Sequence, residues 1–173
     1  MADVTNLIQT KVEDRELIIE RIFDAPRELV FNAYKVPEYL KQWWGPKGWS
    51  LPVCEMDFKP GGVWFYCMKC EDEAQGEYYG MESCGKAYFE EIEEPEKIVV
   101  IDRFADSEGN LAENMPAAHI TYQFEDYDGK TKLISRTQYE TKEALKTVLD
   151  MGVIEGMTQT LNRLEELLME LKK

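Results

Sequence analysis

The sequence predicts an α+β fold in which an antiparallel sheet packs against one long C-terminal helix. Three observations lead to this prediction: a strand-like segment followed by two short helical ones, a run of strands separated by tight turns, and a final stretch with helical periodicity. A chain of 173 residues is long enough for one domain and short for two. We therefore expect a single domain over residues 1–173, in which residues 1–15 form an extra strand or a loose extension.

The first predicted unit is a strand followed by two short helices. Residues 16–23 are rich in β-branched and aromatic side chains, which favour a strand. Pro26 suits a first helical turn, and apolar side chains then recur at helical spacing, so we expect a helix over residues 26–35. Pro37 opens a second short helix over residues 38–44, which ends where a Gly-Pro pair follows.

The middle of the chain consists of strand-like segments joined by turn residues. Consecutive strands with tight turns favour an antiparallel meander. Alternation predicts that Ile120, Tyr122 and Phe124 face the interior and that His119 faces outward. The expected strands are residues 50–58, 63–70, 78–92, 97–105, 118–125 and 131–139.

The last segment has the apolar period of a helix. This period continues from residue 141 to residue 173, which predicts one helix long enough to cross the whole domain. Gly152 and Gly156 lie in its middle, although glycine costs about 1 kcal/mol relative to alanine in a helix. We expect packing to explain both glycines.

The charge of the chain excludes several classes of partner. Acidic side chains outnumber basic ones by 34 to 20, giving a formal net charge of -14. Such a surface repels phosphate, so we expect neither nucleic acid nor an anionic membrane as a partner. There is no apolar run of bilayer length, and the first residues show neither a basic segment nor an apolar signal region. We expect a cytoplasmic protein, either a monomer or a homodimer.

The four cysteines are expected to be reduced thiols, because nothing in the sequence indicates export. Cys67 and Cys70 have the C-x-x-C spacing of some metal and redox sites. Residues three apart in a strand point to opposite faces, so these two sulfurs could not easily share a metal. We interpret them, together with Cys54 and Cys84, as packing residues and expect no metal site.

Catalytic chemistry has little support in the sequence. His119 is the one histidine, and on an outer sheet face it could not activate a buried nucleophile. No phosphate-binding loop, dinucleotide-binding glycine motif or zinc-protease helix motif is present. The acidic cluster of residues 90–96 is expected to stay hydrated, although it could dock a basic partner. We predict no catalytic residue and no cofactor.

Several short motifs follow one another in an order that resembles a known family. They are FDAPRELVF at residues 23–31, WWGP at 43–46, PGGVW at 60–64, GKAYFEEI at 85–92 and DRFAD at 102–106. The set resembles the family related to the C-terminal domain of the heat-shock protein 90 ATPase activator. That family belongs to the superfamily of START, birch-pollen-allergen-like and polyketide cyclase domains, abbreviated SRPBCC. The resemblance runs from about residue 16 to the C-terminus.

The resemblance implies a helix-grip fold, in which a strongly bent sheet grips the C-terminal helix and leaves a cavity reached past the two small helices. Gly152 and Gly156 would let the helix approach the sheet or leave open volume beneath it. The family usually has a tryptophan after the second of these glycines, where this chain has Met157. Bends in such a sheet suit glycine, and the candidates for bulges or corners are Gly61, Gly62, Gly80 and Gly85.

We predict that a set of aromatic, thioether and aliphatic side chains binds a small apolar or aromatic molecule between sheet and helix. The set is Trp43, Trp44, Trp64, Tyr66, Met68, Tyr122, Phe124, Val153 and Met157. These side chains could instead fill the core completely. Two other functions stay open: a chaperone ATPase regulator acting through protein-protein contact, and a cyclase- or hydrolase-like enzyme using the same cavity.

Overall fold

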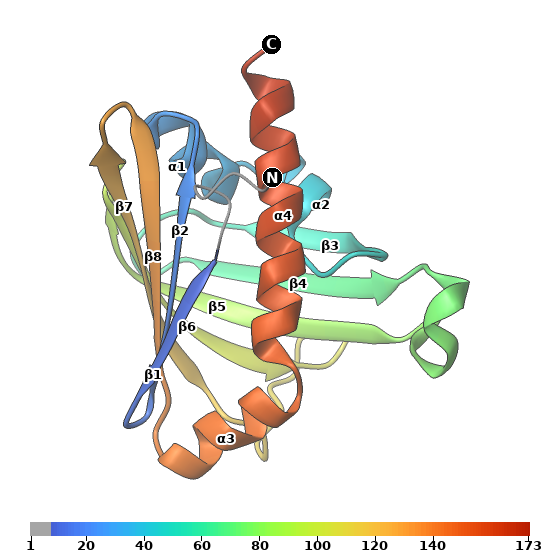
Figure 1. The fold of residues 1–173 in the computed structure, drawn as a ribbon. Coiled ribbons are helices and arrows are strands. Elements are labelled where there is room, and N and C mark those ends of the chain that lie inside the picture. Colours follow the sequence, from blue (N-terminus) through green and yellow to red (C-terminus); the bar gives the residue numbers. More distant parts are fainter. Residues whose placement is uncertain (1–7) are drawn as a thin grey trace.

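The computed structural model describes residues 8–173, and its eight strands form one antiparallel sheet that curls around the C-terminal helix (Figure 1). The strand order is β1-β2-β8-β7-β6-β5-β4-β3. This is the predicted helix-grip α+β fold. In chain order the elements are β1 (Gln9–Glu13), β2 (Glu16–Phe23), α1 (Arg27–Lys35), α2 (Pro37–Trp43), β3 (Trp49–Met56), β4 (Val63–Cys70), η2 (Glu73–Tyr78), β5 (Glu82–Glu93), β6 (Lys97–Ala105), β7 (Ala118–Tyr127), β8 (Lys130–Gln138), α3 (Lys142–Asp150) and α4 (Val153–Leu171).

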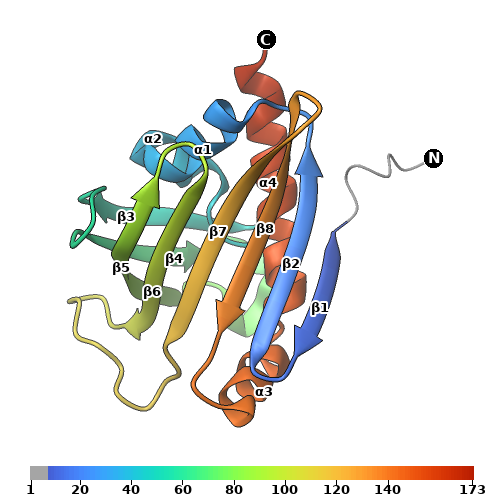
Figure 2. The ribbon, with the colours of Figure 1, turned by 90° about the vertical axis from the view of Figure 1, so that its left-hand side faces the viewer.

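The sheet has a covered inner face and an outer face. Figure 2 shows the strands in front of α4, with α1 and α2 near one end of the sheet and α3 near the other. Ile120, Tyr122 and Phe124 on β7 are buried, as the alternation predicts. His119 lies on the outer face, where its Nε2 is 3.0 Å from a carboxylate oxygen of Glu90. No helix within residues 8–173 is both long and apolar enough to cross a lipid bilayer.

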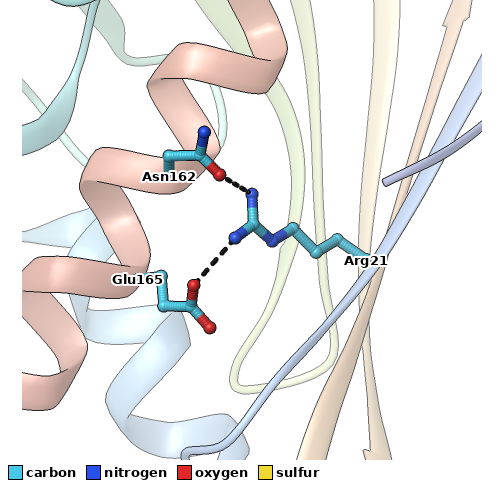
Figure 3. Close-up of polar contacts among 3 residues, drawn as sticks. All are labelled: Arg21, Asn162 and Glu165. Carbon is cyan, nitrogen blue, oxygen red and sulfur yellow. Dashed lines mark hydrogen bonds and ion pairs between the residues drawn. The ribbon is translucent and has the colours of Figure 1, made fainter. Parts of the chain in front are cut away.

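A buried arginine helps to fix α4 on the sheet (Figure 3). Arg21 points inward from β2, and its side chain is only 1% exposed. Its guanidinium donates to the side-chain oxygen of Asn162 at 2.7 Å and to the carboxylate of Glu165 at 2.9 Å, both on α4. Burial lowers the pKa of Arg21, and the charge and hydrogen bond of Glu165 oppose that shift. The helix is therefore attached to the sheet by charge as well as by apolar packing.

The prediction of one continuous C-terminal helix is wrong, because the segment forms two helices, α3 and α4. Gly152 has a left-handed backbone with a φ of 85°, and it separates α3 from α4. A left-handed residue ends an α-helix because the next amide no longer points along the helix axis. The two helices consequently take different directions: α4 crosses the sheet, while α3 lies across one end of it (Figure 1).

The start of β5 and the position of the bulges also differ from expectation. Residues 78–81 precede β5 and belong to a turn region that contains η2, in which Gly76 and Gly80 have positive φ values. The irregularities in strand pairing fall between Ser50 and Val53 and between Phe89 and Glu91, and not at the glycines proposed for them. Gly76 and Gly80 therefore belong to the connection before β5, and the breaks in regular strand pairing occur at other residues. Of the two alternatives for residues 1–15, the structure has the extra strand, observed as β1, while residues 1–7 lie outside the described range.

The expectation of four reduced cysteines is wrong for two of them. Cys67 and Cys84 form a disulfide between β4 and β5, where they stand directly opposite each other with their Cα atoms 4.0 Å apart. Antiparallel pairing brings such partners within bonding reach, and spacing along the sequence does not reveal it. Cys54 and Cys70 are free thiols. The C-x-x-C pair is therefore split, because Cys67 bonds across the sheet and not to Cys70.

Candidate ligand-binding site

A cavity of about 330 Å³ lies between the inner face of the sheet and helices α3 and α4. This volume is within the roughly 300 to 1,000 Å³ of small-molecule sites, so interior packing does not fill the space completely. Its walls come from six strands, the loop after α2, the β6–β7 loop, and both C-terminal helices. The lining residues are Leu17, Ile19, Trp44, Gly45, Pro46, Tyr66, Met68, Ser83, Cys84, Asp102, Arg103, Phe104, Pro116, Ala118, Ile120, Tyr122, Ser135, Thr137, Tyr139, Val148, Met151, Gly152, Val153, Gly156, Met157 and Thr160.

The glycines of the C-terminal segment help to create this space. Gly156 lies on the cavity side of α4, and a Cβ atom built there would meet only the Cγ of Pro46, at 3.8 Å. The missing side chain leaves open volume, as expected from the resemblance. Gly152 lines the same cavity at the break between α3 and α4.

The structure brings six of the nine predicted ligand-binding residues to the cavity, and their role in binding stays a prediction. The six are Trp44, Tyr66, Met68, Tyr122, Val153 and Met157. Trp64 lines a smaller void of about 20 Å³, which shares Trp44, Asp102, Ile120 and Tyr122 with the main cavity. Trp43 and Phe124 line neither space.

Trp43 and Phe124 belong to the packed core. The indole Nε1 of Trp43 donates to the backbone carbonyl of Ala33 at 2.9 Å, which keeps the ring under α1. Phe124 meets the rings of Phe31 and Tyr34 edge to face, with ring centroids 5.3 and 5.2 Å apart. Adjacent tryptophans at the end of α2 thus have different surroundings, and sequence pattern alone assigned both to the cavity.

Asp102 is the polar group that sequence reasoning missed. It lies on β6 and lines both the cavity and the smaller void. Burial raises the pKa of its carboxyl group to about 7, although the hydrogen bonds from Tyr66 and the Arg103 backbone act in the opposite direction. Strand alternation could have indicated this position, because it places Asp102 on the same inward face as Ile98 and Val100, which are buried and apolar.

A glycine on the intervening strand positions Tyr66 against Asp102. The Tyr66 hydroxyl donates to the two carboxylate oxygens of Asp102, at 3.1 and 3.0 Å. Gly85 pairs with Tyr66 across β4 and β5, and a Cβ built on it would lie 2.5 Å from the Tyr66 hydroxyl oxygen and 2.7 Å from its Cζ. The ring can therefore cross β5 only because this residue has no side chain. Burial and the nearby Asp102 charge raise the pKa of Tyr66 well above its ordinary value, so it stays a neutral donor.

The loop after α2 is fixed to α4 by Arg163. Its guanidinium donates to four backbone carbonyls at 2.8 to 3.2 Å, those of Gln42, Gly45, Pro46 and Trp49. Hydrogen bonds from a charged donor are stronger than those between neutral groups, so these four contacts hold the turn firmly. This wall of the cavity is therefore rigidly connected to the helix.

The α3 side of the cavity is covered more lightly. Within α3 only Leu145 and Val148 are buried. Met151, at the end of this helix, lines the cavity and is nevertheless 58% exposed. The cavity therefore reaches the surface beside the junction of α3 and α4.

The chain belongs to the family described as activator of Hsp90 ATPase homolog 1-like protein, whose model matches residues 24–169. The fold and the cavity define the broader class, the helix-grip proteins of the SRPBCC superfamily, as the resemblance of the sequence motifs had indicated. No curated protein matches the sequence.

Solved structures share the fold over nearly the whole chain. Protein Ms6760 from Mycobacterium smegmatis is 31% identical, with a TM-score of 0.82, and the alignment covers 94% of this chain and 95% of that one. A protein from Staphylococcus epidermidis is 34% identical, with a TM-score of 0.77 and coverage of 94% of each chain. A protein from Arthrobacter aurescens is 27% identical, with a TM-score of 0.83 and coverage of 96% and 92%.

Proposed function

We propose that this protein binds a small apolar or aromatic molecule in the cavity between sheet and helix, as a cytoplasmic binding protein without evident catalysis. The observation that carries the proposal is the cavity of about 330 Å³ with walls that are mainly aromatic and aliphatic. Water in such a space makes few hydrogen bonds, so an apolar molecule that replaces it gains the hydrophobic free energy of burial. Trp44, Tyr66 and Tyr122 add flat surfaces for an aromatic ring.

Binding of a neutral apolar probe tests this proposal. We expect 2-ethylnaphthalene to bind with one-to-one stoichiometry and to change tryptophan fluorescence, because Trp44 lines the cavity. Native mass spectrometry of freshly purified protein should in addition detect a retained small molecule. A wild-type protein that takes up no apolar probe of this size would refute the binding role.

A matched pair of variants locates the binding site. Met157→Trp adds bulk inside the cavity and should weaken calorimetric binding of 2-ethylnaphthalene at least tenfold. Met169→Trp places the same residue on α4 at a site that is 46% exposed and outside the cavity lining, so it should leave binding unchanged. Equal effects of the two variants would place the probe elsewhere on the protein.

Regulation of a chaperone ATPase is a second candidate function. The description of the family supports it, and so does an apolar surface beside η2, where Tyr78, Tyr79 and Met81 are each about half exposed. Under this proposal the protein stimulates the ATPase activity of purified Hsp90, and Tyr78→Ser with Tyr79→Ser abolishes the stimulation without changing probe binding. An unchanged ATPase rate over a wide range of concentrations would refute it.

A further inference from the structure

We propose that the cavity selects apolar molecules that carry one cationic nitrogen, such as a protonated amine, and that the Asp102 carboxylate pairs with this nitrogen. The inference rests on the proposed binding function and names the chemical class of the ligand. It follows from the position of the carboxylate, its neighbours and the charge around it.

Small residues flank Asp102 on both neighbouring strands. In the sheet Asp102 is paired with Ala87 on β5 and with Ala118 on β7, and both neighbours are small. Asp102 lines both the cavity and the smaller void, and Trp64 lines the smaller void. A polar group at the end of an apolar ligand can therefore approach the carboxylate without displacing a large side chain.

The Asp102 carboxylate lacks a counter-charge among the described residues. No Lys, Arg or His side chain forms an ion pair with Asp102 within residues 8–173. Its side-chain partner is the neutral hydroxyl of Tyr66. An asparagine would accept that hydrogen bond without the cost of burying a charge. The carboxylate thus gives the cavity a capacity that the fold does not need, namely the ability to neutralise a buried cation.

The cavity lining contains other titratable groups besides Asp102. Tyr66 from β4, Tyr122 from β7 and Tyr139 after β8 line the cavity, and burial raises the pKa of each, so they remain neutral. Cys84 from β5 is in the disulfide, and the lining residues of α3 and α4 include no titratable side chain. On β6 itself, Arg103 follows Asp102 and is also among the lining residues, but strand alternation directs its side chain to the opposite face, and it makes no ion pair with Asp102 within residues 8–173.

The remaining environment favours a cation. The aromatic rings of Trp44, Tyr66 and Tyr122 have negative faces that attract positively charged nitrogen. The net charge of -14 adds a long-range field that concentrates cations and repels carboxylates and phosphates. Shape, local charge and overall charge therefore agree on the same ligand class.

Three probes with the same ring test the inference. 2-Naphthylmethylamine, 2-naphthylmethanol and 2-ethylnaphthalene differ only in the terminal group, which is an ammonium, a hydroxyl and a methyl group. At pH 8 the amine should bind wild-type protein at least tenfold more tightly than the ethyl compound, measured by calorimetry. Between pH 8 and pH 6 its affinity should fall about tenfold, because Asp102 becomes protonated around pH 7, while the affinity of the ethyl compound stays constant.

Two variants assign the effect to one carboxylate. Asp102→Asn should remove the preference for the amine and leave the ethyl compound within twofold of wild type. Glu125→Gln removes one charge from an exposed position on β7 and should keep the preference. The pH series on wild-type protein tests the same charge pairing if the Asp102 variant does not fold.

The outcomes separate this inference from the proposed function. If the ethyl compound binds and the amine shows no preference, the inference is overturned and the apolar binding role stands. If the alcohol matches the amine at both pH values, the site selects a neutral hydrogen-bond donor and the inference is again overturned. If none of the three probes binds, the binding function itself fails.

Discussion

Replacing Asp102 by asparagine should make the stability of the protein less dependent on pH. The carboxyl group has a pKa of about 7 in the folded protein and about 3.9 in an unfolded chain. The folded state therefore keeps this proton over a range in which the unfolded state has released it. Stability from the neutral carboxyl is complete below about pH 4, decreases as pH rises, and is lost above about pH 7.

The size of the effect follows from the difference between the two pKa values. Three units at 1.36 kcal/mol each give a total of about 4 kcal/mol, of which about 2.5 kcal/mol falls between pH 5 and pH 8. Asparagine cannot ionise, so the variant lacks this contribution. Urea unfolding at pH 5 and pH 8 should show wild-type protein losing about 2.5 kcal/mol more than Asp102→Asn.

A second aspartate supplies a control of opposite sign. Asp106 accepts hydrogen bonds in the turn after β6, mainly from Asn110, and these lower its pKa. Its contribution to stability is present above its unfolded pKa and lost as pH falls, so Asp106→Asn should reduce stability more at pH 8 than at pH 3. If wild type and Asp102→Asn show the same pH dependence, the reasoning about the buried carboxyl is refuted.

Three further substitutions test other parts of the structure. Arg21→Met should reduce the unfolding free energy by about 1 to 3 kcal/mol in urea titrations, because Glu165 loses its partner. Adding Glu165→Met should recover part of this loss. An unchanged stability of Arg21→Met would contradict the role of Arg21 in holding α4. Gly152→Ala should lower the unfolding free energy by about 1 to 2 kcal/mol through the left-handed backbone alone, since a Cβ there meets no atom within 4 Å. Gly152→Asn should lower it less, because asparagine tolerates this conformation better. Equal stability of wild type and the alanine variant would refute the assignment of backbone strain. Tyr66→Phe removes a donor to the carboxylate, so the pKa of Asp102 measured by NMR should rise further, and a lowered pKa would contradict the hydrogen bond.

The elements with a strong local signal were predictable from the sequence. The strand over residues 16–23, the two short helices and the inward parity of Tyr122 depend on periodicity and on proline positions, which act locally. The continuous apolar stripe of the last segment hid the break at Gly152, because a left-handed residue need not interrupt the spacing of apolar side chains. The Cys67–Cys84 disulfide depends on strand register, which the sequence does not specify alone.

The candidate site was predictable only as a region. Inward parity correctly brought Tyr66 and Met68 to the cavity, but parity does not tell whether a ring borders empty space or other rings, which is why Phe124 was included. The apolar pattern did not indicate Asp102, because a charged residue at an inward position of a strand is not part of such a pattern. The crossing of Tyr66 over Gly85 needs three strands in register and has no signature within one segment.

The four carbonyl contacts of Arg163 have a consequence for how a molecule could reach the interior. They join the loop after α2 to α4, so this side cannot widen without breaking several charged hydrogen bonds at once. The short α3 has only Leu145 and Val148 as buried anchors, and Gly152 provides a joint at its end. Ligands should therefore enter and leave the cavity by movement of α3. Their exchange rate should depend on the side chains of α3 more than on those of α2.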